Sequence, residues 1–110
     1  MPITGKEPIP IMEIHFNSDS SVMGTENAAT RIEAQLRGRL GRFAERLTTV
    51  EIYVGDVNAA KGGAADKHCK IEARPRGSES VVVTAEASDL DSAARKAGAK
   101  MVSLLDSHFG

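Results

Sequence analysis

Arginine is the residue type in this sequence whose placement points most clearly to chemistry. Five arginines lie between residues 31 and 46, against two glutamates, Glu33 and Glu45. The guanidinium group stays protonated at physiological pH, and its planar donors match the oxygens of a phosphate group. A cluster of this kind predicts phosphate binding if its members share one side of a structural element.

The segment that contains these arginines has the pattern of an amphipathic helix. Its apolar residues recur at helical spacing: Ile32, Leu36, Leu40, Phe43 and Leu47. The spacing predicts a helix over roughly residues 26–47, weakened by Gly38 and Gly41. At roughly 100° per residue, four arginines fill an arc of about 80° beside the apolar stripe, and Arg37 falls on the other flank. These four are Arg31, Arg39, Arg42 and Arg46.

A solvated helix face is the alternative explanation of this cluster, with Glu33 and Glu45 as partners. Like charges one turn apart cost about a few tenths of a kcal/mol per pair, and the helix has no matching row of acids. This repulsion between the arginines favours a functional cluster. The frequency of ordinary charged helix faces in proteins favours the solvated face. Both explanations stay open at this point.

A second amphipathic helix is predicted near the end of the chain. Asp89 is a suitable N-cap, and the helix runs from Leu90 to about Ser107. Lys96 and Lys100 lie one turn apart on one flank. The other flank holds Arg95, Asp91 and Asp106.

The remaining ordered segments alternate apolar and polar residues, which predicts strands with one buried face. They are residues 12–17, 50–55, 69–74 and 81–87. A long connection over residues 56–67 holds two further lysines, Lys61 and Lys67. The order β-α-β-β-β-α predicts an α+β fold, with a four-stranded mixed sheet and both helices on one face. The first strand should pair parallel to the second, and the last three should form an antiparallel meander.

Composition limits the class of protein. The chain has 110 residues and a net charge of −1, so we expect a proline-containing flexible tail over residues 1–11 and one domain over residues 12–110. No apolar run approaches the roughly 20 residues of a membrane span. The single Cys69 cannot form an internal disulfide, and with no signal peptide this favours the cytoplasm.

The sequence offers no arrangement typical of an enzyme or of a metal site. His68 and Cys69 are neighbours in a predicted strand, so they point to opposite faces, with Cys69 on the buried side. The histidines lack metal-ligand spacing, and Lys61 lacks the setting of a phosphate loop. Tyr53 stands among glutamates on the open sheet face, which makes a poor base-stacking platform. We therefore expect no catalytic residues, no metal, no cofactor and no small-molecule substrate.

Taken in order, several segments resemble the ribosome hibernation-promoting factor and ribosome-associated inhibitor family, also called ribosomal subunit interface proteins. The resemblance runs from about Met12 to Leu105 and includes the element order, which is close to a double-stranded-RNA-binding domain with an added first strand. The segments are Asp56-Val57-Asn58, Lys61-Gly62-Gly63, Asp66-Lys67-His68-Cys69, Lys70 to Pro75, and Ala87 to Ala94.

The resemblance implies a protein that binds rRNA of the small ribosomal subunit near the mRNA channel and the tRNA sites. Bound there, such proteins block translation and stabilise idle ribosomes under stress. By position, it implies eight RNA-binding residues: Arg31, Arg39, Arg42, Arg46, Lys96, Lys100, Lys61 and Lys67. Longer members pair ribosomes through a further C-terminal domain, and since the chain ends before one, we do not expect it to pair ribosomes in that way. A monomer or weak dimer is expected.

The final helix departs from the family pattern. Members usually continue it into a run of Arg and Lys, but residues 101–110 contain neither. Fewer phosphate contacts would weaken binding and flatten its dependence on salt. The alternative function is therefore a diverged protein-interaction module with the same fold, which binds through the open sheet face or a sheet edge and no longer binds ribosomes.

Overall fold

Four strands and two long helices form in the order that the sequence predicts. The computed structural model describes residues 12–18, 25–56 and 67–109. The elements are β1 (Glu13–Ser18), α1 (Thr25–Leu40), a 3-10 helix η1 (Gly41–Arg46), β2 (Leu47–Asp56), β3 (Lys67–Pro75), β4 (Val81–Ala87) and α2 (Leu90–Phe109). The predicted α+β fold is confirmed. The predicted tail over residues 1–11 and the position of Lys61 lie outside the described residues.

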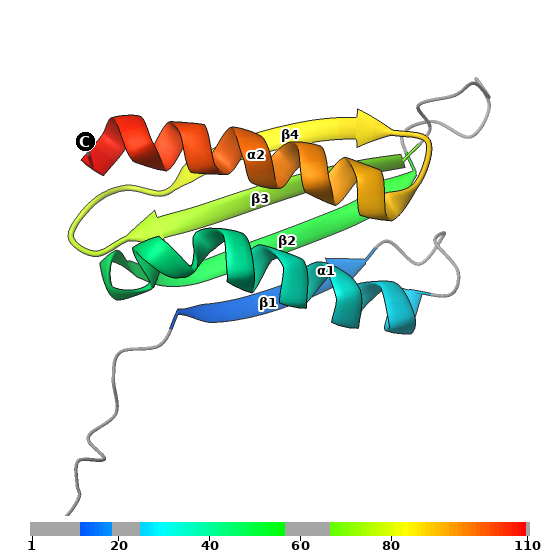
Figure 1. Ribbon diagram of the computed structural model, residues 1–110, viewed down its shortest axis with the longest axis horizontal. Coiled ribbons are helices and arrows are strands. Elements are labelled where there is room, and N and C mark those ends of the chain that lie inside the picture. The colour runs from blue at the N-terminus through cyan, green and yellow to red at the C-terminus, as the bar shows by residue number, and fades with distance from the viewer. Residues whose placement is uncertain (1–11, 19–24, 57–66, 110) are drawn as a thin grey trace, which may run out of the picture.

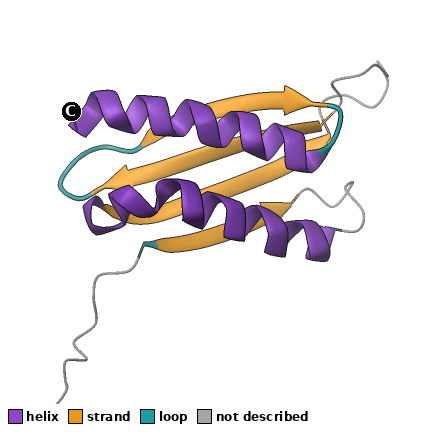
Figure 2. Cartoon of the chain, in the orientation of Figure 1, coloured by secondary structure: helices purple, strands orange, loops and turns teal. Residues whose placement is uncertain are grey.

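The strands form one mixed sheet in the order β1-β2-β3-β4 (Figure 1). β1 pairs parallel to β2, and β2, β3 and β4 pair antiparallel, as predicted. Both helices lie on the same face of this sheet, with α2 over β3 and β4 and α1 on the side of β1 (Figure 2). Register aligns the apolar positions across the strands, as in the row Ile14, Val50 and Ala73. Two layers result, and the second sheet face is left uncovered.

The core between helices and sheet is aliphatic, as the scarcity of aromatic residues requires. Leu36 of α1, Ile52 of β2, Ile71 of β3 and Met101 of α2 are fully buried, and no polar or charged residue of the described part is buried. Cys69 is also fully buried, which confirms its predicted place. Burial raises the pKa of its thiol to about 12, so the group stays protonated and acts as a small core residue.

The first helix ends earlier than the sequence predicts. Instead of continuing to Leu47, the α-helix stops at Leu40, and Gly41–Arg46 form a 3-10 turn before β2. Gly41 favours the end of the α-helix here, because glycine has a low helix propensity. With three residues per turn, Arg46 no longer follows Arg42 at α-helical spacing, and its guanidinium lies over the ring of Phe109. The turn therefore moves the last arginine toward an aromatic side chain.

α2 begins at the predicted cap. The backbone N–H of Ser92 donates to Oδ1 of Asp89 at 2.7 Å, and the Ser92 hydroxyl donates to Oδ2 at 3.2 Å. These bonds, the backbone one first, lower the pKa of Asp89 below its ordinary value of 3.8. The carboxylate thus satisfies a donor at the helix start that would otherwise lack a partner.

This cap predicts a pH-dependent contribution to stability. A depressed folded-state pKa means that ionised Asp89 stabilises the fold above its unfolded pKa, and that this stabilisation is lost as pH falls through the folded pKa. We expect the wild-type protein to melt at a higher temperature than Asp89→Asn near neutral pH, with the gap closing below about pH 4. Thermal melts of both proteins across a pH series measure this. A gap that does not change with pH would contradict it.

Candidate nucleic-acid-binding surface

The two helices touch most closely at Gly98 of α2. A Cβ atom at this position would lie 2.8 Å from Cδ2 of Leu36 and 3.1 Å from Cδ of Arg39. Only glycine leaves room for this approach. The aliphatic part of Arg39 therefore passes over Gly98, which places the arginine side of α1 along the line where the two helices meet.

Two arginines form ion pairs across that line. The Arg31 guanidinium bonds both carboxylate oxygens of Asp91, with Nη2 2.9 Å from Oδ2, and Arg42 bonds Asp106. The first helix itself has no matching row of acids, as the sequence suggests, and the acidic partners of these two arginines come from the other helix. The pairs remain accessible: 58% of the Arg31 side chain and 59% of the Arg42 side chain are exposed. Exposed pairs of this kind contribute only about 0–1 kcal/mol, so a phosphate group can compete for them.

Aromatic side chains hold the last arginine. Cζ of Arg46 lies 5.0 Å from the ring centroid of Phe109, and Cζ of Arg42 lies 4.8 Å from that of Phe43. The two rings stack, with centroids 5.8 Å apart. A cation over an aromatic face is stabilised by the ring quadrupole. Both guanidiniums stay exposed while their positions are fixed.

We call these four residues the arginine seam: Arg31, Arg39, Arg42 and Arg46. The structure brings all four to the side of α1 and η1 that faces α2. The paired acids Asp91 and Asp106 are about 22 Å apart along α2, at ~1.5 Å per residue. Arg39 and Arg46 have no acidic partner within the described residues. The seam is therefore a long, exposed cationic row that is only half neutralised.

Two further arginines adjoin the seam and were missed as candidates. Arg95 lies one helical turn from both Asp91 and Gly98, and it donates to Oγ of Ser92 at 3.1 Å. Arg76 follows β3, and its backbone N–H donates to the carbonyl of Arg46 at 2.9 Å. Helical spacing already places Arg95 on the flank of Asp91 and Asp106, but this arginine is not among the predicted RNA-binding residues. The position of Arg76 depends on how the β3–β4 hairpin packs against η1, which no local pattern reveals.

Three predicted lysines lie apart from the seam. Lys96 and Lys100 face the other flank of α2, where their Nζ atoms donate to the carbonyls of Glu86 at 3.2 Å and Thr84 at 2.7 Å. Both carbonyls belong to β4, the strand at the sheet edge. Lys67 begins β3, opposite Ala87. The structure therefore divides the described candidates into an arginine row between the helices and a lysine pair over the β4 edge.

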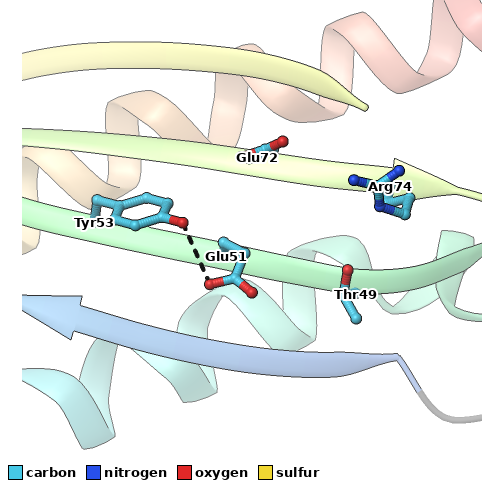
Figure 3. A pocket seen from close by; sticks show the side chains of 5 residues that line it. All are labelled: Thr49, Glu51, Tyr53, Glu72 and Arg74. Atoms are coloured by element: carbon cyan, nitrogen blue, oxygen red, sulfur yellow. Dashed lines mark hydrogen bonds between the residues drawn. The ribbon is translucent and has the colours of Figure 1, made fainter. Parts of the chain in front are cut away.

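The open sheet face holds a shallow polar hollow of ≈ 220 Å³ (Figure 3). It is lined by Thr49, Glu51, Tyr53, Glu72 and Arg74. Glu51 and Glu72 stand directly opposite each other in the β2–β3 register, and the Tyr53 hydroxyl lies 3.5 Å from a Glu51 oxygen. Desolvation first, and then both glutamates, raise the pKa of Tyr53, so its phenol stays protonated and cannot act as a base at neutral pH. No group of His, Cys, Asp or Glu within the described residues has the arrangement of a metal site.

No helix of the described residues is long and apolar enough to cross a bilayer.

Two solved structures share this architecture. The N-terminal domain of Protein Y from Thermus thermophilus has a TM-score of 0.66 at 20% sequence identity, covering 84% of this chain and 94% of that domain. A ribosomal subunit interface protein from Coxiella burnetii has a TM-score of 0.67 at 15% identity, covering 88% of this chain and 97% of its own. No family model matches the sequence, and neither does any curated protein. The resemblance drawn from the sequence is thus confirmed at the level of structure: the chain has the fold of these two proteins.

Proposed function

We propose that this protein binds rRNA of the small ribosomal subunit, near the mRNA channel and the tRNA sites, through the arginine seam. Bound there, it would block translation and stabilise idle ribosomes under stress, in the cytoplasm. The mechanism is steric and electrostatic and involves no chemical step, cofactor or small-molecule substrate. The domain over residues 12–110 would act as a monomer or weak dimer.

The observation that supports this proposal most is the exposed seam with two arginines that have no acidic partner in the described part of the chain. Such side chains form charge-assisted, bidentate bonds with phosphate oxygens. The fold adds support, because a solved structure that shares it is named a ribosomal subunit interface protein. Lys96 and Lys100 form a second contact surface in this proposal, and Lys61 and Lys67 stay candidates for the loop.

Co-sedimentation of the purified protein with bacterial ribosomes, across a salt series, tests the proposal. Each phosphate contact adds roughly one unit to the slope of log affinity against log salt. Four seam contacts should therefore give saturable binding at low salt with a slope of about −3 to −4. Absence of binding even at low salt would refute the ribosomal function.

A protein-interaction module is the second candidate, and the open sheet face favours it. Like charges directly opposite each other, as Glu51 and Glu72 are, destabilise a sheet by up to about 1 kcal/mol, and a basic partner would relieve the repulsion. Charge reversal on this face, Glu51→Lys/Glu72→Lys, separates the candidates. Ribosome binding through the seam should survive it, whereas an interface on the open face should not.

Asp91 and Asp106 compete with RNA for the seam, so removing their charge should tighten binding. Each exposed ion pair contributes about 0.2–1 kcal/mol, which must be given up when phosphate takes its place. We expect Asp91→Asn/Asp106→Asn to bind RNA roughly 2- to 30-fold more tightly, with little change in melting temperature. Titration of wild type and variant with a labelled RNA measures this.

The matched control for this comparison is Glu13→Gln/Glu86→Gln. It changes the net charge by the same amount on the open sheet face. If the control tightens binding equally, overall charge rather than relief of the seam explains the gain.

A further inference from the structure

One end of the arginine seam differs from the rest because aromatic rings meet it there. Phe109, near the end of α2, is half-buried and stacks on the buried Phe43. The exposed His108 packs edge-on against it, with ring centroids 4.9 Å apart. Arg46 lies over the same ring. We call this group, Phe43, Phe109, His108 and Arg46, the aromatic corner.

Backbone and aromatic contacts, and not only ion pairs with acids, orient the arginines around the corner. Nε of Arg76 donates to the carbonyl of Glu45 at 2.9 Å, which holds its guanidinium beside the end of η1. Arg42 lies on the other side of the corner, over the Phe43 ring. Arg46 makes no ion pair with any described residue. Its guanidinium donors and its outer planar face are therefore available to a ligand.

A phosphate group alone does not need this arrangement, since Arg31 and Arg39 of the seam meet no aromatic ring among the described residues. Proteins that recognise unpaired RNA stack the exposed base on aromatic side chains or on arginine planes, while nearby cations hold the backbone. The corner supplies both an aromatic and arginine surface for a base and nearby cations for the backbone. A base pair inside a duplex cannot use it, because both of its faces are covered by its neighbours in the helix.

We propose that the aromatic corner binds one unpaired nucleobase of a bound RNA, which stacks on the Arg46 and Phe109 pair while Arg42 and Arg76 contact the adjacent phosphates. This inference rests on the proposed RNA-binding function and adds to it a preference for a junction between duplex and single strand. The rest of the seam contacts the backbone without regard to base, and the corner, with Arg46, requires a base.

The test compares three RNAs on the full chain: a blunt duplex, the same duplex with a short purine overhang, and the same overhang as an abasic sugar-phosphate. Stacking contributes about 1–3 kcal/mol per base, so the purine overhang should bind roughly 5- to 100-fold more tightly than the abasic one. Phe109→Leu keeps apolar volume at the corner but removes the ring, and it should abolish that difference without changing the salt slope. Arg31→Ala, at the far end of the seam, should lower the salt slope and keep the difference.

The outcomes distinguish this inference from the function on which it rests. Equal affinity for purine and abasic overhangs, with salt-dependent binding of all three RNAs, overturns the corner and leaves the seam intact. A difference that persists in Phe109→Leu also overturns it, since the base would then stack elsewhere. Failure of all three RNAs to bind at low salt removes the proposed function together with the inference.

Discussion

Arg39→Glu/Arg42→Glu should lose ribosome binding almost completely. The two side chains occupy the middle of the seam, and each substitution replaces a phosphate contact with a repulsive charge. A hydrogen bond to a charged group contributes about 1.5–3 kcal/mol, so two lost contacts lower the affinity by on the order of 100-fold or more. The salt slope should fall by about two units. Co-sedimentation at fixed ribosome concentration, repeated across salt, measures both quantities.

The control for this variant must carry the same charge change at another place. Arg37→Glu/Arg74→Glu does so: Arg37 lies on the opposite flank of α1, where it pairs with Glu33, and Arg74 lies on the open sheet face. Neither touches the seam. If both double variants lose binding to the same extent, the effect comes from net charge, and the seam is not the binding surface.

Gly98→Ala should destabilise the protein, although alanine is the better helix former. The added Cβ would lie 2.8 Å from Cδ2 of Leu36, closer than two carbon atoms approach without bonding, and Leu36 is fully buried, so its side chain or the helix must shift within the core. Overpacking of this kind costs about 1–3 kcal/mol, whereas replacing glycine by alanine in a helix gains ~1 kcal/mol. The cost therefore exceeds the gain over most of this range and equals it at the lower end. Each kcal/mol corresponds to about 4–8 °C in melting temperature for a domain of this size.

Gly38→Ala is the matched control, and it should change stability in the other direction. Gly38 lies on an exposed turn of α1, and an added Cβ there meets nothing within 4 Å. The substitution should therefore stabilise the fold by about 0.5–1 kcal/mol. Thermal melts of both variants under the same conditions decide the question. Equal stabilisation by both substitutions would mean that the helices do not approach as closely at Gly98 as the structure places them.

Elements with a regular pattern were predictable from the sequence. The alternation in β1 to β4 and the apolar stripes of α1 and α2 each report which residues are buried, so the sheet, the covered face and Cys69 in the core all followed. The cap at Asp89 followed as well, because its chemistry is local. The end of α1 was not predictable, since the change from the α-helix to the 3-10 helix η1 depends on how the chain must enter β2 at Leu47.

The candidate site was predictable only as far as a single helix reaches. The common side of the four arginines was predicted from one continuous helix, and in the structure all four face α2 although Arg42 and Arg46 belong to η1. Their partners were not predicted, because Asp91, Asp106 and Phe109 lie far along the chain and reach the seam only after both helices pack on the sheet. Charge balance across a helix pair is a tertiary property, and a count along one helix misses it.

The lysine pair over β4 has a consequence for how molecules of this protein meet one another. An edge strand presents backbone groups on which a strand from a second molecule can add, which leads to aggregation. Here Lys96 and Lys100 donate to two β4 carbonyls and place positive charge along that edge. To pair with this edge, a strand from a second molecule would have to displace both ammonium groups. If that strand were the β4 of another copy, its own two lysines would also repel those of the first molecule. The same two side chains thus protect the protein against edge-to-edge polymerisation at high concentration. A variant without these two positive charges should aggregate, and the first sign should be turbidity of its concentrated solution.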